Sequence, residues 1–137
     1  MLMTRPFTVL KGVAVWCGII VVEVFHGIAR TLFLAPALGD FRARQVAVFT
    51  GSVLILILAT SLIRWIHPAD TGEAVYVGLV WLVLTFAFEM AFGRYVVHAP
   101  WSRIASDYNL LRGGLLPIGL LVLTASPLIA GKLRHVL

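Results

Sequence analysis

The amino-acid sequence predicts an all-α integral membrane protein, a bundle of four transmembrane helices that forms a single membrane domain over residues 1–137. Three observations lead to this fold class. The hydrophobic fraction is 61% and the charged fraction is only 12%, whereas about 25% of the residues of a soluble domain are charged. A soluble chain of 137 residues has too little interior to bury so much apolar surface. Four apolar segments are also long enough to cross a bilayer, and they lack the two-residue alternation of strands.

The predicted spans follow one another through one short and two long connections. The spans are residues 10–30, 45–66, 73–93 and 113–131. Residues 67–72, HPADTG, contain proline and glycine and predict a tight turn. The long connections, residues 31–44 and 94–112, are rich in leucine, valine and aromatic residues, which favours interfacial segments. With four spans, both long connections lie on the same face of the membrane.

The first and third spans carry charged residues among apolar ones. The stretch IIVVEVFHGIAR contains Glu23, His26 and Arg30, and the stretch FAFEMAFGRYVV contains Glu89 and Arg94. Inserting a charge at the centre of a bilayer costs about 2.5–3.5 kcal/mol, so these groups are expected to pair inside the bundle. Glu23, His26 and Arg30 share one helix face, because they stand at positions i, i+3 and i+7.

The two halves of the chain share a spacing of acidic residues. Glu23 and Glu89 each precede a glycine by four residues, and Asp40 and Asp107 follow them by 17 and 18 residues. This spacing favours a duplicated helical hairpin with its two copies in parallel orientation. Coincidence in a short chain is the alternative.

The charged residues near the long connections form the candidate site. The candidate ligand- or ion-binding residues are Glu23, His26, Arg30, Glu89, Arg94 and Asp107. The candidate contacts for lipid headgroups or anions are Arg42, Arg44, Arg103 and Arg112. In this hypothesis the carboxylates accept a cation or a proton, and the guanidinium groups hold carboxylates or an anionic group of the solute.

This cluster predicts a small membrane protein that binds a small ion or polar solute and, as a further expectation, translocates it. Two alternatives stay open. One is an accessory or structural subunit of a membrane complex, whose buried charges fix assembly. The other is a membrane enzyme that acts on a lipid or a quinone, although no catalytic residue is assigned because no hydrolase motif is present.

No cofactor, metal or nucleic acid is expected. Only His26 among the four histidines is placed inside a span, which argues against a haem held by two histidines. Cys17 is the single cysteine and excludes an internal disulfide or a multi-cysteine metal site. The net charge is +5, but the basic residues stand beside apolar segments and form no basic run of the kind that binds nucleic acid.

The expected partners are the lipid bilayer and either further copies of the chain or a larger membrane complex. Oligomers are expected because four helices alone leave little room for an enclosed pathway. Basic residues near both ends of the chain, Arg5 and Arg134 among them, favour an orientation with both termini in the cytoplasm. The predicted location is a bacterial-type inner membrane.

Overall fold

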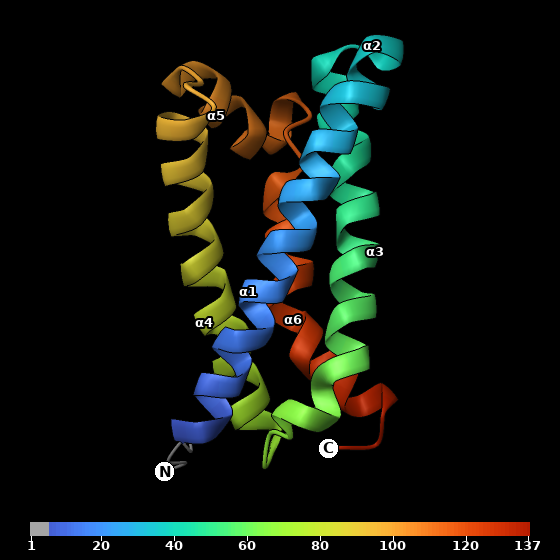
Figure 1. The fold of residues 1–137 in the computed structure, drawn as a ribbon, viewed down its shortest axis with the longest axis vertical. Coiled ribbons are helices and arrows are strands. Elements are labelled where there is room, and N and C mark those ends of the chain that lie inside the picture. Colours follow the sequence, from blue (N-terminus) through green and yellow to red (C-terminus); the bar gives the residue numbers. More distant parts are fainter. Residues whose placement is uncertain (1–5) are drawn as a thin grey trace.

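The computed structural model describes residues 6–137, and all the regular structure in this range is helical (Figure 1). The long helices are α1 (Pro6–Ala29), α3 (Asp40–Ile66), α4 (Thr71–Ala91) and α6 (Leu116–Leu133). The short ones are α2 (Ala35–Leu38) and α5 (Trp101–Tyr108). Arg5, one of the basic residues behind the predicted orientation, lies outside the described residues.

Four helical stretches are long and apolar enough to cross a membrane. They are Pro6–Leu38, Asp40–Ile66, Thr71–Val96 and Leu116–Leu133. Large apolar side chains such as Phe25, Val53, Val83 and Leu121 are exposed on their outer surfaces. Lipid is the solvent that tolerates such a surface, and a helix satisfies its own backbone hydrogen bonds there. The chain is therefore an integral membrane protein in contact with the bilayer, which confirms the predicted fold class.

The first long connection is more helical than the sequence suggests. A π-helical turn, Arg30–Leu34, carries α1 directly into α2, and only Gly39 separates α2 from α3. Pro36 has no N–H to donate to the carbonyl of residue 32, which interrupts the α-helical ladder there. Gly39 has a φ of 87°, a conformation that favours glycine. The chain therefore reverses direction through a single residue and not through a long loop.

The second long connection crosses the end of the bundle. After α4 a π-helical turn, Phe92–Val96, leads to α5, and a 3-10 turn, Leu110–Arg112, leads to α6. Each half of the chain thus runs through a long helix, a π-helical turn, a short helix and a second long helix. Figure 1 shows that α1 and α4 run in the same direction, as parallel hairpins require, with α5 lying across one end.

The four long helices form a ring in the order α1, α3, α6 and α4, since each of these helices packs against the next. The half of this ring beside residues 67–70 is called the short-turn half, and the opposite half is called the long-connection half. The buried apolar core lies mainly in the short-turn half, where Ile63, Val77, Trp81 and Ala130 are almost completely buried. The long-connection half has fewer such residues and leaves space between the helices.

Two tryptophans join α1 to α4. The indole Nε1 of Trp81 donates a hydrogen bond of 2.8 Å to the carbonyl oxygen of Gly12. In the opposite sense, Nε1 of Trp16 on α1 donates a 2.8 Å hydrogen bond to the hydroxyl of Thr85 on α4. A hydrogen bond of this kind satisfies the one polar atom of an otherwise apolar buried ring.

The crossing of α4 and α6 is closer still. A Cβ added to Gly78 would lie 1.9 Å from the carbonyl oxygen of Thr124, so only glycine permits this approach. Pro127 lies inside α6 and leaves the carbonyl of Leu123 without its helical donor. The hydroxyl of Ser126 donates to that carbonyl at 2.7 Å, which is a common compensation for proline in membrane helices.

Candidate functional site

The long-connection half contains a cavity of about 590 Å³. Its walls come from all four long helices and from α5. Apolar residues such as Ile19, Ile55 and Leu123 line its deep end, and charged residues line the end toward the long connections. The volume lies within the range of about 300–1,000 Å³ that is usual for small-molecule sites.

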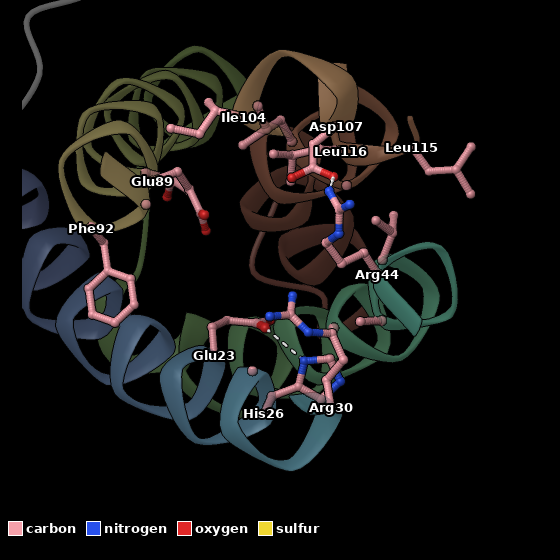
Figure 2. Close-up of a pocket in the computed structure, with 18 of the residues that line it drawn as sticks. Glu23, His26, Arg30, Arg44, Glu89, Phe92, Ile104, Asp107, Leu115 and Leu116 are labelled. Carbon is pink, nitrogen blue, oxygen red and sulfur yellow. Dashed lines mark hydrogen bonds and ion pairs between the residues drawn. The ribbon is translucent and has the colours of Figure 1, made fainter. Parts of the chain in front are cut away.

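Five of the six candidate ligand-binding residues line this cavity. They are Glu23 and His26 from α1, Arg30 from the π-helical turn that follows it, Glu89 from α4 and Asp107 from α5 (Figure 2). Arg94 does not line it. The guanidinium of Arg94 lies 5.3 Å from the ring centre of Trp101, and Nη1 donates a 3.4 Å hydrogen bond to the carbonyl oxygen of Ala99. Arg94 therefore stabilises the segment that leads to α5 and is not part of the cavity wall.

The four arginines proposed as headgroup or anion contacts divide into two pairs. Arg42 and Arg112 are exposed and lie outside the cavity, where headgroup contact stays a prediction. Arg44 and Arg103 line the cavity. These two are engaged with aspartates of the same protein.

An ion-pair network joins the two long connections. Arg44 donates from Nε to Oδ2 of Asp40 at 3.0 Å, and its Nη1 forms a second ion pair with Asp107 on α5. Arg103 reaches Asp40 from α5, with 3.4 Å between Nη2 and Oδ2. Each aspartate is thus paired with an arginine from the other half of the chain. Burial raises the pKa of the Asp107 carboxyl above its ordinary value, whereas the Arg44 guanidinium lowers it.

Glu23 lies at the contact between α1 and α3. Its Oε2 is 3.4 Å from Nδ1 of His26, and Nε2 of His26 lies 2.6 Å from the hydroxyl of Thr50 on α3. Gly51 makes the close approach possible, because a Cβ at this position would lie 3.1 Å from Oε2 of Glu23. This arrangement fixes one oxygen of the Glu23 carboxylate.

Three buried polar side-chain atoms have no hydrogen-bond partner within the described part of the chain. They are Oε1 of Glu23, Nε of Arg30 and the hydroxyl of Tyr108. All three residues line the cavity, although they come from two helices far apart in the sequence. Buried polar atoms in folded proteins are nearly always paired, so an unpaired acceptor and two unpaired donors around one cavity indicate a site for a polar ligand.

Glu89 adds a second carboxylate to this group. Within residues 6–137, no hydrogen bond or ion pair engages its side chain. Figure 2 shows the Glu89 and Glu23 side chains entering the cavity from α4 and α1.

Comparison with protein-family models, curated proteins and solved structures finds no match to this chain.

Tyr108 is a candidate site residue that sequence reasoning missed. Burial, together with the neighbouring carboxylates of Glu89 and Asp107, raises the pKa of its phenol to about 12. The phenol is therefore a neutral hydrogen-bond donor at ordinary pH. The only sequence signal was its position directly after Asp107 and shortly before the last span.

The side chains of the cavity do not form a metal centre within the described range. No group of three or more histidine, cysteine, aspartate or glutamate residues there is arranged to hold a metal ion. The groups present suit hydrogen bonding and ion pairing, with carboxylates as acceptors and the guanidinium and phenol as donors.

Proposed function

We propose that this protein binds a small polar solute or ion inside the membrane, in the cavity between its four long helices. The observation that carries the proposal is the convergence of three unpaired buried atoms, from Glu23, Arg30 and Tyr108, on one cavity of about 590 Å³. Leaving a buried donor or acceptor unpaired costs about 1–3 kcal/mol. A bound ligand that pairs with one or more of these atoms recovers part of that free energy.

The accessory-subunit alternative stays a prediction, because the ion pairs of the long connections lie within one chain. Asp40, Arg44, Arg103 and Asp107 are paired with one another and link the two long connections. Their charges therefore suit a structural role in holding α5 over the bundle. Translocation is a further prediction, and it requires the helices packed around Trp81 in the short-turn half to separate.

The test uses the full-length protein in lipid nanodiscs. Its thermal unfolding is followed in the presence of a panel of small cations, anions, zwitterions and uncharged polar solutes. Small molecules that co-purify with the protein are identified by mass spectrometry of an extract. A bound ligand stabilises the folded protein by mass action, so one class of the panel should raise the unfolding temperature in a saturable way.

The variant Tyr108→Phe separates a binding role from a structural one. It removes an unpaired buried hydroxyl, so the ligand-free protein should be as stable as the wild type or more stable. The stabilisation produced by the ligand should fall. Tyr95→Phe is the matched control, because Tyr95 is 73% exposed and does not line the cavity. The proposal is wrong if no solute stabilises the wild type, or if both variants respond to the ligand as the wild type does.

A further inference from the structure

The residues that line the cavity have an unusual charge balance for this chain. Four acidic residues line it, Glu23, Asp40, Glu89 and Asp107, together with three arginines, Arg30, Arg44 and Arg103. The set carries one net negative charge when all members are ionised, whereas the whole chain has a net charge of +5. Four of the six acidic residues of the protein are therefore gathered around one cavity.

The internal pairing of these residues leaves the excess charge on two glutamates. Arg44 and Arg103 are engaged with Asp40 and Asp107. Of the remaining lining charges, Glu23 and Glu89 are acidic and Arg30 is the only arginine. No ion pair within the described residues joins Arg30 to either carboxylate. Across residues 6–137 Glu89 has no such partner, and in Glu23 only Oε1 lacks one, since Oε2 contacts His26. Two carboxylates with at least one free oxygen each therefore share the cavity with one guanidinium, which favours a positively charged ligand over an anion.

Most of the other residues that line the cavity are apolar or aromatic, with Gln45, Ser52 and Thr85 among the polar exceptions. Phe88 of α4 and Phe92, the first residue of the π-helical turn that follows, line it and stack on each other with 5.2 Å between ring centres. Trp16 meets Phe88 edge to face at 6.4 Å, and Figure 2 shows Phe92 between α4 and α1. Aromatic faces attract organic cations, and an apolar wall offers nothing to a hydrated inorganic ion. The volume of about 590 Å³ also exceeds what a single bare ion fills.

We infer that the ligand of this cavity is an organic monocation, an ammonium group on an apolar or aromatic body. The ammonium lies between Glu23 and Glu89, and the body packs against the wall that contains Phe88 and Phe92. This inference rests on the proposed function and specifies its ligand class. An ammonium N–H donor supplies the partner that Oε1 of Glu23 lacks. Its single charge balances the single net negative charge of the lining residues.

The experiment compares three probes that share a phenyl ring and differ in charge. They are 2-phenylethylammonium, 2-phenylethanol and 3-phenylpropanoate, titrated at neutral pH against the wild-type protein in nanodiscs and followed by tryptophan fluorescence and calorimetry. The ammonium should bind at least tenfold more tightly than the alcohol and the carboxylate. In Glu89→Gln and Glu23→Gln the affinity for the ammonium should fall at least tenfold, with little change for the alcohol. Arg64→Gln, at an exposed position outside the cavity, should leave all three affinities unchanged.

The wild-type series decides the inference even if a glutamine variant does not fold, which circular dichroism and gel filtration would reveal. Equal or tighter binding of the alcohol or the carboxylate overturns it. If none of the three probes binds but an anionic or uncharged solute of the wider panel does, the inference of a monocation is wrong and the proposed binding function stands. If no solute binds at all, both are wrong.

Discussion

Replacing Arg44 tests whether the ion-pair network holds the long-connection half together. The side chain of Arg44 is 12% exposed and forms two ion pairs, with Asp40, which is 52% exposed, and with Asp107, which is 27% exposed. Arg44→Gln removes the positive charge and keeps a polar side chain of moderate length. It leaves Asp107 partly buried without its guanidinium partner.

The expected loss of stability is dominated by Asp107. Breaking a buried ion pair by removing one partner costs about 3–5 kcal/mol. The pair with Asp107 falls at the low end of this range because the carboxylate is partly exposed, and the more exposed pair with Asp40 adds about 0.5 kcal/mol. We therefore expect a loss of about 3 kcal/mol, or about 10 °C in the unfolding midpoint of a chain of this size.

The loss should depend on pH. Burial raises the pKa of Asp107 in the folded protein, and Arg44 opposes that rise. Without Arg44 the folded-state pKa rises further above its unfolded value, so the folded variant binds its proton more tightly than the unfolded chain does. Stability is then lost as the pH rises from the unfolded pKa, about 4, through the folded pKa. The variant should be closest to the wild type near pH 4 and furthest from it near pH 8.

Thermal unfolding in nanodiscs at both pH values measures these differences. Arg42→Gln is the control, since Arg42 lies two residues away on α3 and is exposed. Asp107→Asn in the Arg44→Gln background should recover most of the lost stability, because no unpaired carboxylate remains. If Arg44→Gln and Arg42→Gln unfold at the same temperature, or the Arg44→Gln loss is greater at pH 4 than at pH 8, the structural role assigned to the network is refuted.

Three further predictions concern single positions. Gly78→Ala should cost about 3 kcal/mol of unfolding free energy, because its methyl group meets a backbone oxygen at the crossing of α4 and α6; Gly18→Ala, where an added Cβ meets nothing within 4 Å, should cost nothing in the same thermal assay. Gly51→Ala should crowd the Glu23 carboxylate and lower the affinity for a bound cation about tenfold, with a small effect on stability. Calorimetry measures the affinity, and an unchanged value would show that Glu23 does not bind the cation. A spectrophotometric titration of wild type minus Tyr108→Phe should give one phenol that ionises near pH 12, and a midpoint near the ordinary tyrosine value of about 10 would contradict the burial of that hydroxyl.

The transmembrane organisation could be predicted because the bilayer limits the choice of structure. In lipid, an apolar segment of this length can pair all its backbone N–H and C=O groups within itself only as a helix. Helix ends were less predictable, because composition does not reveal that Pro36 and Gly39 reduce the first long connection to a sharp bend. The 14 residues expected between the first two spans are therefore almost entirely helical.

Within the spans, the cavity residues were predictable where a regular helix fixes their direction, and Asp107 was predicted from the shared spacing of acidic residues. Arg30 follows Glu23 by seven residues, about 20° short of two full turns, and both line the cavity. Arg94 follows Glu89 by five residues, about 140° away around the helix, and points elsewhere. Tyr108 lies on α5, and no periodicity in a connecting segment indicates which side of a short helix will face the bundle.

The two tryptophan hydrogen bonds join α1 and α4 on one side of the cavity and, among the described residues, leave the helix ends beside α5 without such a link. Glu89 lies eight residues beyond Trp81, about 12 Å further along α4. A small tilt of α4 relative to α1 about these hydrogen bonds displaces each residue in proportion to its distance from them. The displacement is small at Thr85 and largest at the ends of the helices next to α5. A change in the spacing of α1 and α4 beside Glu89 therefore leaves the packing around Trp81 almost unchanged.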